Sequence, residues 1–177
     1  MMANPRTLLV AADSGMQAAV LRRGLEDAGY QVIEAHDGEE ALALAASKHP
    51  HAVLSDIHMP RMNGYDLCRA IRRDKSLSTT PVILLSELSD PLDLVKGLDS
   101  CADAFVTKPY DFPTLVGRIE ALTGAPVPPA PTGKRQRAKV SISGEMLSVP
   151  AQNPLILNLR ASLYENAELQ YRPLAST

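Results

Sequence analysis

Residues 53–64 read VLSDIHMPRMNG, and this stretch decides the fold. It continues a short apolar run, Ala52–Ser55, which has the length of a strand and little polar alternation. That pattern is typical of a strand whose sheet is covered on both faces. Asp56 follows directly, at the end of the strand. The stretch therefore predicts an α/β protein with polar side chains at one edge of its sheet.

The rest of the first 123 residues repeats this alternation of short apolar runs and helical spacing. The other predicted strands are Thr7–Ala12, Val32–Ala35, Val82–Leu85 and Ala104–Thr107. Five helices are predicted between and after the strands, with apolar faces at Met16, Val20, Leu21, Leu25 and Ala28; at Ala41, Leu44 and Ala45, with Asp37 as N-cap; at Leu67, Cys68 and Ile71; at Leu92, Val95 and Leu98; and at Leu115, Val116, Ile119 and Leu122. Five βα units predict a doubly wound, five-stranded parallel sheet.

The composition is that of a globular protein, with 45% hydrophobic residues, 21% charged residues and a formal net charge of −2. This balance lacks the basic excess of nucleic-acid binders, so DNA is not expected as a partner. No apolar run approaches the ~20 residues that span a bilayer. The two cysteines, Cys68 and Cys101, do not indicate a disulfide framework. We therefore expect a cytoplasmic protein that does not contact the membrane.

Four polar residues follow four of the predicted strands: Asp13, Asp56, Ser86 and Lys108. In a parallel sheet these strand ends lie at one edge, so the four side chains should converge. Taken singly, an aspartate there is more often a helix cap and a lysine is more often solvated. Taken together, two carboxylates favour Mg²⁺, one of them can attack phosphorus, and the ammonium can neutralise the transferring oxygens.

Residues 6–123 resemble the receiver (CheY-like) domains of bacterial two-component response regulators. The matching stretches are LLVAADS at 8–14, DGEEAL at 37–42, VLSDIHMPRMNG at 53–64, PVILLS at 81–86 and ADAFVTKPY at 102–110. The resemblance implies that Asp56 is the phosphoacceptor and that Asp13, Asp56 and the backbone carbonyl of His58 hold Mg²⁺. It implies that Ser86 binds the phosphoryl group and that Lys108 forms an ion pair with it. Phe105 matches the aromatic that changes rotamer as Ser86 moves, although it could equally be a core aromatic.

The implied fold is flavodoxin-like, and the implied function is that of a response regulator. A sensor histidine kinase would phosphorylate Asp56, and the protein would then switch its protein contacts. It would be no turnover enzyme, because a receiver catalyses only its own aspartyl phosphorylation and dephosphorylation. The sequence departs from the family where Ala12 replaces the first of two acids and where Cys101 replaces a glycine. The alternative is therefore a pseudo-receiver, a constitutive interaction module that does not switch.

After the receiver, predicted over residues 1–123, the composition changes. Residues 124–138 read as a proline-rich and basic linker, and residues 139–177 as a small extension. A hairpin is predicted from Lys139–Ser143 and Met146–Val149 around Gly144-Glu145. A helix over Leu155–Gln170 carries Ile156, Leu159, Leu163 and Ala167 on one stripe. This stripe suggests a homodimer through the helix, with docking onto the receiver as the alternative.

Overall fold

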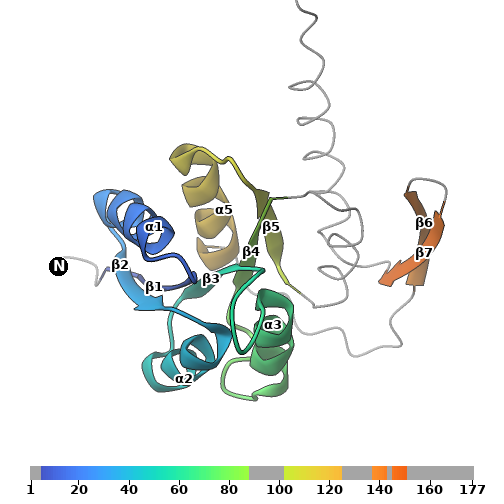
Figure 1. Cartoon of the computed structure of the whole chain (residues 1–177), viewed down its shortest axis with the longest axis horizontal. Helices are drawn as coiled ribbons and strands as arrows, with labels where there is room; N and C mark the ends of the chain where they lie inside the picture. The colour runs from blue at the N-terminus through green and yellow to red at the C-terminus, as the bar shows by residue number, and fades with distance from the viewer. Residues whose placement is uncertain (1–4, 88–101, 125–136, 143–144, 151–177) are drawn as a thin grey trace, which may run out of the picture.

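The computed structural model describes residues 5–87, 102–124, 137–142 and 145–150 (Figure 1). Its main sheet is parallel and has the order β2-β1-β3-β4-β5. The strands are β1 (Thr7–Ala11), β2 (Gln31–Ala35), β3 (Ala52–Asp56), β4 (Val82–Ser86) and β5 (Ala104–Thr107). The predicted flavodoxin-like fold is confirmed. The predicted fourth helix, Cys101, residues 125–136 of the predicted linker and the helix over 155–170 with its dimer stripe lie outside the described residues. The predicted linker bounds are wrong at both ends, because Gly124 belongs to α5 and Arg137 to β6.

Four described helices flank this sheet: α1 (Gly15–Asp27), α2 (Gly38–Lys48), α3 (Gly64–Arg73) and α5 (Phe112–Gly124). Figure 1 shows α1 and α5 on one face of the sheet and α2 and α3 on the other. Alternate strand residues feed two cores, because neighbouring side chains of a strand point to opposite faces. Leu8 and Val10 pack with the α1/α5 side, whereas Leu9 and Ala11 pack with the α2/α3 side.

Capping side chains start the first three helices at the carboxyl edge of the sheet. Ser14, Asp37 and Asn63 are the N-caps of α1, α2 and α3, and each side chain accepts a backbone N–H of the first turn. Such caps satisfy donors that have no partner inside the helix. The predicted cap at Asp37 is confirmed. The helix starts therefore lie beside the strand ends that carry the polar residues.

The predicted buried face of α1 is partly wrong. Leu21 and Leu25 are buried as predicted, but the third buried residue is Ala18. Met16 and Val20 are 80% and 55% exposed, and Ala28, also predicted on this face, is exposed at the C-cap of the helix. The stripe that meets the sheet follows i, i+3 and i+7 spacing, and Met16 lies on the opposite side of that stripe.

Two further strands, β6 (Arg137–Ile142) and β7 (Glu145–Pro150), pair antiparallel in a sheet of their own. Glu145 was predicted in the turn but belongs to β7 and pairs with Ile142, while Ser143 and Gly144 lie outside the described residues. Where the structure describes helices, none is long and apolar enough to cross a membrane.

Candidate functional site

Asp56 ends β3 as a buried carboxylate with a cation beside it. Its residue is 4% exposed, and Nζ of Lys108 lies 2.8 Å from its Oδ1. Burial is the largest influence and raises the pKa of Asp56 above its usual value; the Lys108 ammonium opposes the rise, and the charges of Asp13 and Glu87 add to it. The site therefore holds a carboxylate that is costly to ionise and that a positive charge favours in its ionised form.

Asp13 follows β1 and is exposed. Strand β2 pairs with one edge of β1, and β3 pairs with the other edge, so the strand order reverses direction at β1. Ligands of open parallel sheets bind at such a switch point. The negative charge of Asp13 adds to the rise in the pKa of Asp56, as a nearby like charge does.

Asp13, Asp56 and the carbonyl of His58 are the oxygen donors predicted for Mg²⁺, and their chemistry suits that ion. That ion prefers oxygen ligands and keeps several waters, so it needs few groups from the protein. Within the described residues, no three metal-binding side chains gather. Ala12, where the family has an acid, is fully buried, and its N–H donates to the Ala35 carbonyl at 3.1 Å. The side chain at position 12 therefore adds no oxygen donor to this edge.

Ser86 ends β4 and is 4% exposed. Its backbone carbonyl accepts the Lys108 N–H at 2.7 Å, which ties the start of the loop after β5 to the end of β4. Phe105 lies in β5, is half-buried and packs against both cores. The structure thus brings Ser86 and Lys108 to the same edge as Asp56. The rotamer change of Phe105 stays a prediction.

The loop between β3 and α3 carries His58, which is exposed. Gly64 closes this loop, because its N–H donates to the Ile57 carbonyl at 2.8 Å. A Cβ at Gly64 would lie 2.4 Å from the carbonyl oxygen of Asp56. Only glycine lets the start of α3 approach the backbone of the candidate phosphoacceptor this closely.

Three residues near Asp56 were not predicted as site residues from the sequence. Gln17, in the first turns of α1, accepts from Lys108 Nζ through its Oε1 at 3.4 Å. Buried Ser55 donates from Oγ to the Asp56 carbonyl at 2.8 Å. Burial, with the charge of Asp56 as a second cause, raises the pKa of Tyr110 to about 12. The adjacency of Ser55 to Asp56 and of Tyr110 to Lys108-Pro109 was the only signal for these two.

The geometry just described agrees with a comparison of the sequence with known families. The model of the response regulator receiver domain matches residues 8–120. The chain belongs to this family. Its fold, its strand-end residues and the sequence match therefore point to the same class of signalling domain.

Two curated relatives have sequences similar to this receiver. The chain is 36% identical over 119 residues to the probable transcriptional regulator ycf27 of Cyanophora paradoxa, and 36% identical over 118 residues to the DNA-binding dual master transcriptional regulator RpaA of Synechocystis. Each match covers 67% of this chain and 48% of the relative. The chain thus spans about half the length of the curated relatives it matches, and those relatives bear the names of regulators, not of enzymes.

These names contradict the prediction that DNA is not a partner. We drew that prediction from the balanced charge of one chain. In a regulator the receiver and the DNA-contacting part can be separate, so the charge of a receiver carries no information about what the other part binds. The prediction is wrong for that reason.

Solved structures show the same fold. The signal receiver domain of a histidine kinase from Syntrophus aciditrophicus is 39% identical, with a TM-score of 0.65 over 67% of this chain and 90% of that one. The receiver domain of the sensor histidine kinase PA1611 from Pseudomonas aeruginosa, crystallised with magnesium coordinated in its active site cleft, is 24% identical. Its TM-score is 0.66 over 69% of this chain and all of that one, which shows the shared fold.

Proposed function

We propose that this receiver accepts a phosphoryl group on Asp56 from a sensor histidine kinase and changes its protein contacts in response. The observation that carries the proposal is the 2.8 Å contact between Lys108 Nζ and Asp56 Oδ1 at the switch point of the sheet. Burial disfavours the ionised form of Asp56 and raises its pKa, so the residue is not an ordinary solvated surface acid. It is a suitable nucleophile for a phosphoryl group whose charge the ammonium can share.

In the proposed reaction, an oxygen of Asp56 forms a bond to phosphorus as the bond from phosphorus to the donor histidine nitrogen breaks. The imidazole leaves with that electron pair and takes a proton from solvent. The Lys108 ammonium moves its contact from the carboxylate to a phosphoryl oxygen, and the Ser86 hydroxyl donates to another. Gln17 holds Lys108 from the α1 side during this exchange, since its Oε1 already accepts from Nζ.

Asp13, Asp56 and the His58 carbonyl would hold Mg²⁺ in this site. The ion supplies positive charge for the transferring oxygens when it is bound. Because the chain lacks an acid at Ala12, we expect weaker binding of the ion than in receivers with two acids after the first strand.

The proposed output is control of transcription, because the two relatives described above are named as transcriptional regulators. Ser86 and Phe105 would pass the signal on. Phe105 packs against both cores from the edge strand β5, so a change at Ser86 could alter its rotamer and the surface beside it.

The decisive experiment is phosphorylation of the full chain with acetyl phosphate or phosphoramidate and Mg²⁺, followed by intact-protein mass spectrometry. We expect one added phosphoryl group in the wild type and none in Asp56→Asn. The matched control is Asp27→Asn, which changes an exposed carboxyl at the C-terminal end of α1, and it should be phosphorylated normally.

A non-switching pseudo-receiver is the second candidate, and Ala12 is the observation that favours it. It predicts no mass gain in the wild type under saturating donor and metal. Phosphorylation that persists in Asp56→Asn would instead place the acceptor elsewhere in the chain.

A further inference from the structure

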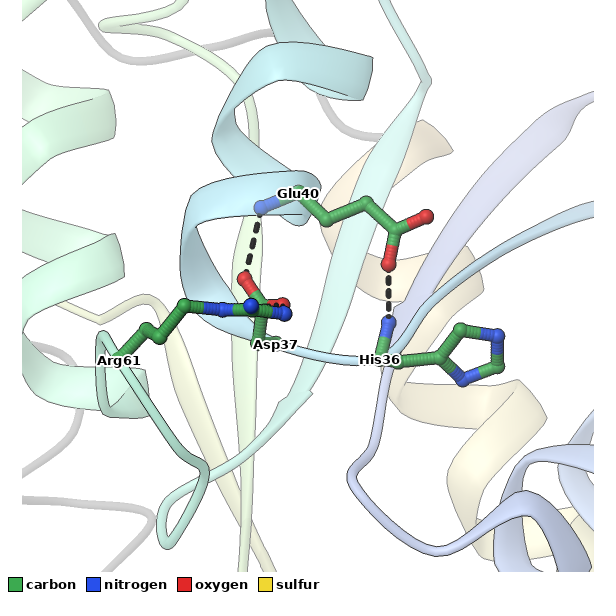
Figure 2. Close-up of polar contacts among 4 residues, drawn as sticks. All are labelled: His36, Asp37, Glu40 and Arg61. Atoms are coloured by element: carbon green, nitrogen blue, oxygen red, sulfur yellow. Dashed lines mark hydrogen bonds and ion pairs between the residues drawn. The ribbon is translucent and has the colours of Figure 1, made fainter.

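The carboxylate of Asp37 joins two loops at the carboxyl edge of the sheet (Figure 2). Its Oδ1 accepts the Glu40 N–H at 2.9 Å, which caps α2. Its Oδ2 accepts Nε of Arg61 at 2.9 Å and also contacts Nη2 of the same guanidinium. The Asp37 side chain is 2% exposed, whereas that of Arg61 is 66% exposed. A buried acid therefore holds an otherwise solvated arginine across 24 residues of sequence.

The backbones also meet at this junction. A Cβ at Gly38 would lie 2.3 Å from the Met62 carbonyl oxygen, so the start of α2 lies directly against the β3–α3 loop. Arg61 has a φ of 64°, in the left-handed region that residues other than glycine rarely adopt. A residue persists there only where its surroundings determine its conformation. The two contacts to Asp37 and the neighbouring Gly38–Met62 approach are such surroundings.

The turn that carries Asp37 is itself held in place. Oε2 of Glu40 reaches back to the His36 N–H at 2.7 Å, while the Glu40 N–H donates to Asp37 (Figure 2). The Glu40 N–H and the Arg61 guanidinium together hold the pKa of Asp37 below its usual value, so the acid is charged at neutral pH. Arg61 is thus bound to a helix start that two hydrogen bonds hold in place.

His58 lies between the two points at which this loop is held. On one side is Asp56, whose backbone is packed against Gly64, and on the other is Arg61. We propose that Asp37 and Arg61 are positioning residues, which hold the β3–α3 loop so that the His58 carbonyl is ready to receive the cation. This inference rests on the proposed function, since it concerns the metal ligand of that site.

The direction in which Arg61→Gln changes the Mg²⁺ affinity distinguishes a positioning role from a purely electrostatic one. Arg61 is a positive charge in the loop that carries a metal ligand, so a purely Coulombic view predicts that Arg61→Gln tightens Mg²⁺ binding. If Arg61 positions the loop, the same substitution weakens binding, because the carbonyl loses its fixed location. Changes to groups that support metal ligands typically cost 10–100-fold in affinity, and we expect roughly tenfold here.

Two further variants sharpen the comparison. Asp37→Asn keeps an oxygen that can cap α2, since asparagine is as good an N-cap as aspartate, but it removes the charge that holds Arg61. Arg61→Lys keeps the charge but loses the guanidinium fork, so it should restore only part of the affinity. The matched control is Arg69→Gln on α3, whose Nη1 lies 2.8 Å from Asp66 Oδ1 in an ion pair whose two side chains are both exposed.

The experiment measures Mg²⁺ titrations and amide hydrogen exchange of residues 57–63, both by NMR on the full chain. Arg61→Gln and Asp37→Asn should each bind the ion about tenfold more weakly, and their loop amides should exchange faster without Mg²⁺. The double variant should lose little more than either single one, because both remove the same contact. Arg69→Gln should match the wild type in both measurements.

Unchanged exchange and unchanged or tighter Mg²⁺ binding in Arg61→Gln would overturn the inference. A wild type that binds no Mg²⁺ would instead count against the proposed function. In that case loop exchange still decides whether Asp37 and Arg61 hold the loop.

Discussion

Nζ of Lys108 lies 2.8 Å from Oδ1 of Asp56, although β4 separates the two strands from which these residues come. The long side chain reaches past the end of β4 to the buried carboxylate, and its backbone N–H is bound to the Ser86 carbonyl at 2.7 Å. One residue thus links the ends of three strands. Its charge also opposes the effect of burial on the pKa of Asp56.

Removing this ammonium should change the pH dependence of phosphorylation. In Lys108→Gln the pKa of Asp56 should rise further, because burial then acts without the opposing cation. The acid limb of the rate profile with phosphoramidate should move to higher pH, and the rate near neutrality should fall on the order of 10²-fold. Lys48→Gln, at the end of α2, is the control. An unshifted acid limb would mean that Lys108 does not influence the ionisation of Asp56.

Asp56→Asn should raise the free energy of unfolding at neutral pH in the presence of EDTA. Burial lifts the pKa of Asp56 in the folded protein above the value of 3.8 expected for the unfolded chain. The wild type therefore has its full stability at a pH below the pKa of Asp56 in the unfolded chain. It loses stability as the pH rises through the pKa of Asp56 in the folded protein. The advantage of the variant should therefore be largest at about pH 7 and shrink toward about pH 4. Urea titrations at both values test this; a wild type more stable than the variant at neutral pH would contradict it.

Ala12→Asp should tighten Mg²⁺ binding by roughly tenfold, because the ion gains a negative neighbour. Position 12 is fully buried, so the new carboxylate should also destabilise the metal-free protein. We expect a lower melting temperature in EDTA and a larger rise on adding Mg²⁺ than in the wild type. Ala12→Asn provides the uncharged control. Equal Mg²⁺ affinity in wild type and Ala12→Asp would show that the family's first acid has no counterpart at this position.

Two glycine substitutions should have opposite effects on stability. In Gly64→Ala the new Cβ would lie 2.4 Å from the Asp56 carbonyl oxygen, so we expect a loss of about 1–3 kcal/mol, typical of overpacking. In Gly117→Ala, inside α5, nothing lies within 4 Å of the new Cβ. That variant should gain about 0.5–1 kcal/mol from the lower chain entropy of alanine. Denaturant unfolding measures both; a neutral Gly64→Ala would mean that the loop can move away from Asp56.

The sequence by itself determined the order of strands and helices, the N-cap at Asp37 and the positions of Asp13, Asp56, Ser86 and Lys108 at strand ends. Hydrophobic period and helix capping are local properties, so they can be read from a few neighbouring residues. Parallel topology then brings the strand ends to one edge of the sheet.

Only the tertiary structure decided how the residues at that edge meet. The contact of Lys108 with Gln17 joins residues 91 positions apart, and that of Arg61 with Asp37 joins residues 24 apart. Neither has a local signal, because an arginine or a glutamine near a loop has the same sequence pattern whether it is solvated or bound. The buried side of α1 was likewise decided by packing, since Met16 and Leu21 are both apolar and the position of the sheet determines which of them is buried. Contacts of this kind depend on how close two backbones come, as Gly38 does to Met62, and that distance is a property of the folded chain.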